Sequence, residues 1–94
     1  MIQIEIAAEF PLGRVVSTAN AVEKLKAEDV IACIQRHARC DWGDLTEEDA
    51  TLNDLSLQDE GRLLSAYSDS NGVKFWIITE WDRSVTTVLL PEDY

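Results

Sequence analysis

Hydrophobic and polar residues alternate at the start of the chain. Ile2, Ile4 and Ile6 are separated by single polar residues, a period of two that is typical of a half-buried strand. Pro11 then interrupts the alternation. We therefore expect residues 1–9 to form an N-terminal strand extension that is available to the sheet of the domain.

The next segments predict one short extended piece and two helices. The sequence Arg-Val-Val-Ser at 14–17 is typical of an extended segment, and Ser17, Thr18 and Asn20 all offer a side-chain oxygen to cap a helix that follows. A second helix is predicted to begin near Asp29 and to end before Gly43, a residue suited to a left-handed turn. The apolar face expected for this second helix consists of Val30, Ile31, Ile34 and Ala38.

A third helix is predicted within the most acidic part of the chain. The stretch 41–60 contains eight carboxylates and no basic side chain. Thr46 and Asp49 approximate a capping box, and acidic residues in the first turn of a helix are favoured by its dipole. We expect this helix to bury Leu45, Leu52 and Leu55. The carboxylates expected on or near the opposite face are Asp44, Glu47, Glu48 and Asp54.

The last third of the chain changes to a period of two. Residues 62–68 and 73–81 read as strands on either side of an Asp-Ser-Asn-Gly turn, and residues 85–90 read as a third strand. A strand, then helices, then a three-stranded antiparallel meander predict an α+β fold with two to three helices packed on one face. A chain of 94 residues is expected to form a single domain, 1–94.

Composition narrows the function classes. Eighteen acidic and eight basic residues give a formal net charge of -10, which repels nucleic acid and membrane surfaces and attracts basic protein surfaces. No apolar run approaches the ~20 residues of a membrane span, and the first residues do not resemble a signal peptide. We therefore expect a cytoplasmic protein. Cys33 and Cys40 are too few for a disulfide framework and are expected to be free thiols.

Candidate metal ligands do not form a complete set. Cys33, His37 and Cys40 are spaced so that they could line one helical face, and their side chains are ligands that zinc prefers. A closed zinc site needs a fourth ligand. The acidic residues of the stretch 41–49 lack the spacing of a calcium-binding loop. No metal and no other cofactor is therefore predicted.

His37 is the only histidine in the chain. Beside Asp41 or Asp44 it would titrate close to neutrality and could act as a general acid or base. The hydroxyl residues available as nucleophiles lie on predicted strands or turns with no elbow motif, so the sequence does not predict an enzyme. A structural alternative is a buried polar knot that ties the helix end to the sheet. Its expected members are His37, Asp41, Trp42, Arg62 and Glu80.

Three segments carry a resemblance to a known group of proteins. They are FPLGRVVST at 10–18, RHARCDWGDL at 36–45, and the stretch 61–94, which contains ITEWDRSVTTVLLP. In these motifs the chain resembles small plasmid-related proteins of bacteria, which are carried on mobile elements. It departs from their pattern at Cys40, where they usually have glycine. The resemblance implies a mobile-element setting and no established activity. A methyltransferase label sometimes given to such proteins is unsupported, because the chain has no glycine-rich cofactor loop after a strand.

The leading hypothesis follows from the acidic stretch and from this resemblance. Acidic residues three or four apart on a helix have Cβ atoms ~5–6 Å apart, a spacing comparable to that of phosphates. We expect a non-catalytic inhibitor of the anti-CRISPR or anti-restriction type that acts partly as a DNA mimic. Its partner would be a basic nucleic-acid-binding protein of the host, without direct binding to nucleic acid or membrane. The residues predicted to bind it are Trp42, Asp44, Glu47, Glu48, Asp49, Asp54 and Trp81.

Three other interpretations stay open. Ordinary solvation of a surface helix also explains a run of charge. The strand at 73–81 is apolar on both faces, so its second face must be covered by the N-terminal segment, a twin subunit or a partner. This favours a dimeric plasmid accessory protein that binds through its sheet face. The order of elements also resembles that of small toxin ribonucleases, although their basic surfaces differ in sign from this chain.

Overall fold

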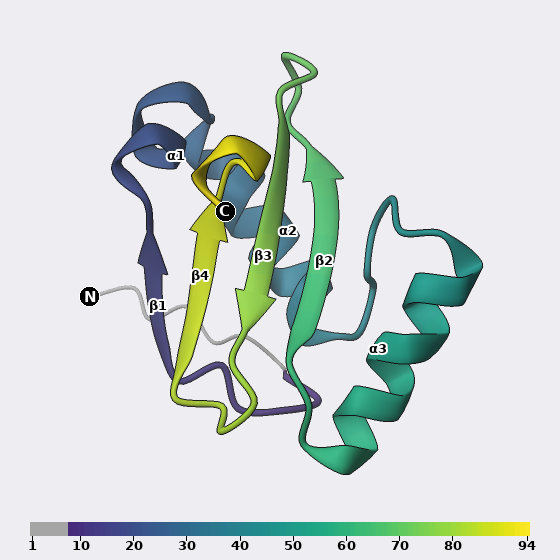
Figure 1. Ribbon diagram of the computed structural model, residues 1–94. Helices are drawn as coiled ribbons and strands as arrows, with labels where there is room; N and C mark the ends of the chain where they lie inside the picture. Colours follow the sequence, from purple (N-terminus) through teal and green to yellow (C-terminus); the bar gives the residue numbers. More distant parts are fainter. Residues whose placement is uncertain (1–7) are drawn as a thin grey trace.

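The computed structural model describes residues 8–94, which form an α+β fold. Residues 1–7 of the strand extension predicted at 1–9 lie outside the described residues, and Ala8 and Glu9 are not in a strand. The elements in chain order are β1 (Arg14–Ser17), α1 (Ala19–Lys24), α2 (Ala27–Ala38), α3 (Glu47–Asp59), β2 (Leu63–Ser68), β3 (Lys74–Thr79), β4 (Val85–Leu89) and the short 3₁₀ helix η1 (Pro91–Asp93). Helix α2 lies behind the sheet, whereas α3 lies beside its β2 edge (Figure 1).

The four strands form one mixed sheet in the order β1-β4-β3-β2. The predicted meander is present, since β2 pairs with β3 and β3 with β4, both antiparallel, with Ile77 opposite Ser65 and Val88. The sheet is not purely antiparallel, however, because β1 pairs with β4 in parallel, with Arg14 opposite Val85. Parallel neighbours need a long connection, and here it runs through all three helices and two strands. Turn residues in the sequence mark hairpins and carry no signal for such a distant pairing.

The strand predicted at 73–81 is shorter in the structure and ends at Thr79. A turn follows, in which Arg83 adopts a positive φ of 59° and its amide donates to the Glu80 carbonyl at 2.9 Å. Trp81 lies in this turn and not on the strand, and 64% of it is exposed. Trp81, which the sequence placed on this strand, is therefore a surface residue of the turn.

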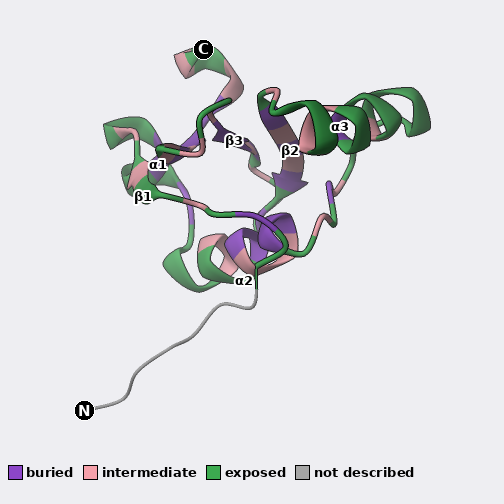
Figure 2. Cartoon of the chain, turned by 90° about the horizontal axis from the view of Figure 1, so that it is seen from below, coloured by how far each residue is buried: buried purple, intermediate pink, exposed green. Residues whose placement is uncertain are grey.

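The main core lies between the sheet and the helices α1 and α2. Figure 2 shows that α2 turns its buried residues toward the sheet, while α3 is exposed over much of its surface. The principal core contains Ala21, Leu25, Cys33, Ile34, Tyr67, Phe75, Ile77, Val88 and Leu90. Ile31, expected on the buried face of α2, is 48% exposed. A second cluster, formed by Phe10, Trp42 and Leu63, joins the N-terminal segment to the edge strand β2.

The opposite face of the sheet is covered in part by the C-terminal residues of the chain. The segment with η1 crosses in front of β4 and β3 (Figure 1). The rings of Trp76 and Tyr94 meet edge to face with centroids 5.6 Å apart. Ile78 and Leu89, on this face, are only 3% and 6% exposed. The apolar second face that the sequence predicts is therefore covered largely from within the chain.

Helix α3 docks on β2 through Asn53 and packs Ala50 and Leu57 against the second cluster, as the expected Leu45 before the helix also does, but Leu52 and Leu55 take no part. Asn53 is 6% exposed; its amide donates to the Leu64 carbonyl at 2.5 Å and its side-chain oxygen accepts from the Leu64 amide at 3.2 Å. These bonds satisfy both backbone groups of an edge-strand residue and fix the rotation of the helix. Leu52 and Leu55 consequently face solvent, with 57% and 52% exposure. The prediction that these two leucines are buried is wrong.

Candidate functional site

The N-terminus of α3 is capped as the sequence predicts. The Asp49 amide donates to the Thr46 hydroxyl oxygen at 3.2 Å, and the first turn contains Glu47, Glu48 and Asp49. Three carboxylates at the positive end of a helix dipole each gain about 0.3–1 kcal/mol. These residues therefore have a local structural reason to be acidic, in addition to any role in binding.

The carboxylates around α3 are exposed and lack basic partners. The exposed members of the predicted site in this region are Asp44, Glu47, Glu48, Asp49 and Asp54. The ion pairs found within residues 8–94 join Lys24 to Glu92, Arg36 to Asp41 and Arg62 to Glu80. None of these pairs involves α3. Its acidic surface is thus left with a single sign of charge.

Arg83 is a basic side chain that does reach α3, but it binds backbone oxygens. Its guanidinium donates to the carbonyls of Ser56 at 3.2 Å and Gly61 at 2.5 Å, and also to that of Glu80 at 3.1 Å. The last turn of α3 contains no basic residue of its own. Arg83 therefore stabilises the negative, C-terminal end of the helix dipole. It does not pair with the outward carboxylates of α3.

Trp42, predicted to anchor a partner, is a core residue. It is only 6% exposed and packs in the cluster of Phe10 and Leu63. Its indole Nε1 donates to Asp54 at 3.0 Å, so this carboxylate also has a structural task. Gly43, the next residue, lets the chain bring Trp42 into the core. It has φ +74° and lies so close to β2 that a Cβ would meet the Ala66 carbonyl at 2.0 Å.

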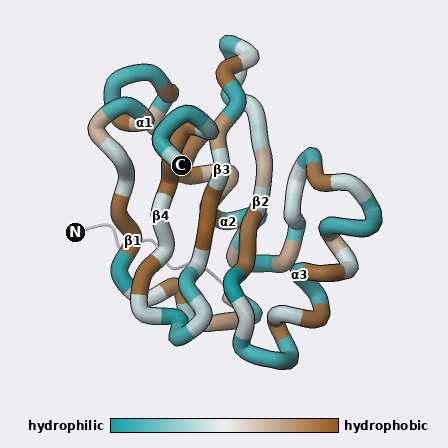
Figure 3. The backbone as a smooth tube through the Cα atoms, viewed as in Figure 1, coloured by the Kyte–Doolittle hydropathy of each residue, from teal (hydrophilic) through white to brown (hydrophobic). Residues whose placement is uncertain are grey.

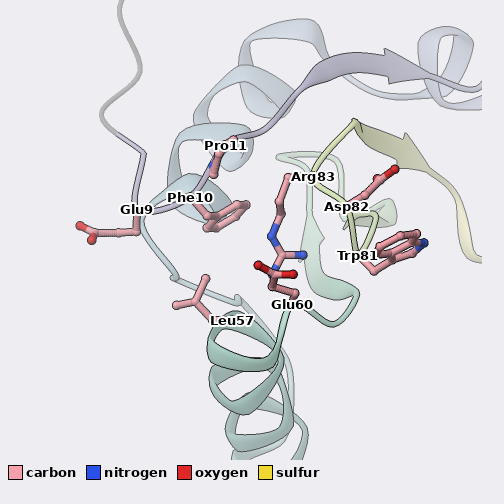
Figure 4. A pocket seen from close by; sticks show the side chains of 8 residues that line it. All are labelled: Glu9, Phe10, Pro11, Leu57, Glu60, Trp81, Asp82 and Arg83. Carbon is pink, nitrogen blue, oxygen red and sulfur yellow. The ribbon is translucent and has the colours of Figure 1, made fainter.

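Trp81 does lie at the surface, beside a pocket at the C-terminal end of α3. The pocket has a volume of about 520 Å³. Its side chains come from three separate parts of the chain, with the Arg83 guanidinium extending between Phe10 and Trp81 (Figure 4). The lining residues are Glu9, Phe10, Pro11, Leu57, Glu60, Trp81, Asp82 and Arg83.

His37 lies at the centre of a buried chain of hydroxyl groups. Its Nδ1 is 2.5 Å from Ser65 Oγ, and its Nε2 is 2.9 Å from Thr79 Oγ1. Thr79 and Thr86 are joined at 2.7 Å, and Thr86 donates to the Leu12 carbonyl at 2.7 Å. The imidazole and the three hydroxyl residues are fully buried.

The terminal acceptor fixes the direction of each bond from Leu12 back to His37. A carbonyl accepts only, so the single proton of Thr86 goes to Leu12, and Thr79 must donate to Thr86. Thr79 Oγ1 then accepts from Nε2–H of His37. When the imidazole is neutral, its Nδ1 accepts from Ser65, and the ring is held in the Nε2–H tautomer.

The surroundings of His37 favour this neutral form. The rings of Phe10 and Trp42 meet it edge to face, with centroids 5.4 and 5.6 Å away. Burial lowers the pKa of His37 from 6.5 to about 4, and the positive charge of Arg83 acts in the same direction. Because the imidazole and Ser65 are both sealed from solvent, a substrate has no route to them in this conformation.

The predicted polar knot is divided among separate places. Asp41 pairs with Arg36 at 2.8 and 3.3 Å, which lowers the pKa of its carboxyl group. Arg62 pairs with Glu80 at 3.1 and 3.3 Å on the surface. Only His37 is part of the buried network. The sequence analysis did not predict the hydroxyl partners of His37. A serine or threonine on each of the three predicted strands, at a position that faces the interior, could have indicated them.

The two cysteines form no disulfide, and neither thiol is activated as a nucleophile. Cys33 and Cys40 are both free, and burial raises the pKa of each thiol. Within residues 8–94 no three His, Cys, Asp or Glu side chains are grouped so that they could hold a metal ion. The same part of the chain contains no helix with the length and apolar character needed to cross a membrane.

No protein-family model matches the chain, and neither a curated protein nor a solved structure gives a significant match. The resemblance to plasmid-related proteins therefore stays a prediction.

Proposed function

We propose that this protein is a non-catalytic binding module whose α3 surface engages a basic surface of another protein, in competition with nucleic acid. One observation carries the proposal: Asp44, Glu47, Glu48 and Asp49, within six residues of the chain, are all exposed and have no ion-pair partner among the described residues. A chain with a net charge of -10 also attracts basic partners at long range.

The fold itself does not require all of this charge. Two like charges 6 Å apart in water repel by about 0.7 kcal/mol before screening. The helix dipole offsets this cost for the first turn, but Asp59 and Glu60 lie at the opposite end, where negative charge is unfavourable. Charge that folding does not need is available for binding a basic partner.

The finer proposal is an inhibitor carried by a mobile element, of the anti-CRISPR or anti-restriction type, that blocks a host nucleic-acid-binding complex. Its support is the resemblance of the segments 10–18, 36–45 and 61–94 together with the acidic surface. The sealed position of His37 supports a non-catalytic role. The covered second face of the sheet gives a dimer through that face less support than the acidic surface has.

A matched pair of double variants tests the α3 surface. E47K/E48K reverses two charges in the first turn of α3, whereas E23K/E28K reverses two exposed charges on α1 and α2. Both variants change the net charge by the same amount. The probe is a fluorescent lysine-rich peptide, whose binding is followed by anisotropy at low and moderate salt, with duplex DNA as a competitor for the peptide.

We expect E47K/E48K to weaken binding at least tenfold and the control pair to weaken it less than twofold. Wild-type binding should also weaken steeply as salt screens the charges. Equal losses in the two variants would mean that binding follows net charge alone, and the proposal would then be wrong.

A further inference from the structure

The outward face of α3 is not purely acidic. Leu52 and Leu55 are more than half exposed, and residues three apart on a helix are neighbours on its surface. Single exposed leucines are ordinary, but these two form a ridge. Figure 3 shows hydrophobic segments interrupting the hydrophilic ones along α3.

A groove adjoins this ridge. It lies between α3 and the edge strand β2 and has a volume of about 270 Å³. Leu45, Leu52 and Leu64 give it apolar walls, and Asp49 and Asn53 line it as well. Leu45 and Leu64 are half-buried, so the groove continues the exposed ridge inward. It offers space for an apolar side chain supplied by a partner.

Carboxylates flank this apolar surface at both ends. Glu48 lies one helical turn before Leu52, and Asp59 lies one turn after Leu55. An apolar centre with a charged rim is the usual anatomy of a protein–protein interface. A surface that only imitated DNA would not need the two leucines at its centre.

We propose that α3 and its groove form a docking surface for a protein segment that carries an apolar side chain between lysines or arginines, such as a basic amphipathic helix. The apolar side chain enters the groove beside Leu52, and the cations meet Glu48, Asp49 and Asp59. The inference rests on the proposed function and names the chemistry of its partner. A second copy of the chain fits poorly, because a twofold contact would bring two acidic rims together.

The test uses two helical peptides of 18 residues and the full chain. One peptide combines lysine with leucine at helical spacing, and the other replaces each leucine by serine. Isothermal titration calorimetry gives affinities for wild type, L52Q/L55Q, E47K/E48K and the control V22Q/I31Q. Val22 and Ile31 are also exposed, at 69% and 48%, and line a separate apolar groove. Thermal melting verifies that all three variants fold.

We expect L52Q/L55Q to weaken binding of the leucine peptide at least tenfold and to leave the serine peptide unchanged, while V22Q/I31Q stays within twofold of wild type. If L52Q/L55Q binds normally and E47K/E48K weakens both peptides, the docking surface is refuted and the proposed function stands. If E47K/E48K weakens neither, the proposed function fails. A wild-type dimer that L52Q/L55Q dissociates would make the surface a self-interface and overturn the inference.

Discussion

Acid should destabilise this protein through one residue, and the single histidine makes the effect easy to isolate. In the folded state the pKa of His37 is about 4, against an ordinary value of 6.5, chiefly because the ring is buried and secondly because Arg83 is positively charged. The folded state therefore resists protonation that the unfolded chain accepts. Stability is complete above pH 6.5 and is lost as the pH falls from 6.5 toward 4.

The size of the loss follows from the difference between the folded and unfolded pKa values of His37. A tenfold change in proton affinity corresponds to about 1.4 kcal/mol, so the difference between 6.5 and about 4 is worth roughly 3 kcal/mol. The free energy of unfolding should fall by at most about 1.4 kcal/mol per pH unit, which is the slope for the uptake of one proton. For a domain of this size, a loss of roughly 3 kcal/mol lowers the melting temperature by roughly 12–24 °C.

Carboxylates with lowered pKa values act at lower pH. Burial and pairing differ among them, but the pKa of each of Asp29, Asp41, Asp82 and Asp93 lies below its ordinary value of 3.8. Stability that they contribute is present above pH 3.8 and is lost below it. The window between pH 4 and 6.5 therefore reports His37 in particular.

The assay is urea unfolding at several pH values between 7.5 and 4.5 for wild type and H37Q. Glutamine does not titrate, so H37Q should be less stable at pH 7.5 and its stability should change far less across the window. Nitrogen-15 NMR of the imidazole should show the Nε2–H tautomer. A wild-type unfolding free energy that stays level down to pH 4.5, or an imidazole that titrates near 6.5, would refute the reasoning.

Two further substitutions test how the edge of the sheet is closed. N53A removes the amide that pairs with both backbone groups of Leu64, and it should lower the unfolding free energy by about 2 kcal/mol. The control is Q58A, at an exposed position of the same helix, which should change the unfolding free energy by less than about 0.5 kcal/mol. G43A should cost more than N53A, since its Cβ would meet the Ala66 carbonyl at 2.0 Å in a left-handed backbone. Urea denaturation measures each loss, and a G43A protein as stable as wild type would disprove the close approach.

The parts of the fold that sequence predicts well are those with local signals. Thr46 caps α3 because its side chain needs only the amide three residues later. The hairpin between β2 and β3 forms at the predicted turn, where Asp69 accepts from the amides of Asn71 and Val73, and Gly72 adopts a positive φ of 81°. Each of these contacts joins residues that are no more than four positions apart in the chain.

Contacts between distant residues account for the errors. The leucines at 52 and 55 have helical spacing for a buried face, but the backbone of Leu64 binds Asn53 and turns the helix the other way. His37 lies 28 residues from Ser65 and 42 from Thr79. Hydropathy alone gives no indication of these pairings, because a polar residue that is satisfied in the interior has the same pattern as one at the surface.

The docking of α3 through backbone groups has a consequence for function. Asn53 binds Leu64, and the loop at Gly43 forms a bridge with Ala66, so the outer edge of β2 is occupied and does not invite pairing with another strand. The helix is held by its inner side alone. Its outer leucines contribute little to folding, and L52Q/L55Q should therefore change the free energy of unfolding by less than about 1 kcal/mol. A larger loss would show that these side chains stabilise the fold, and it would remove the reason to assign them to a partner.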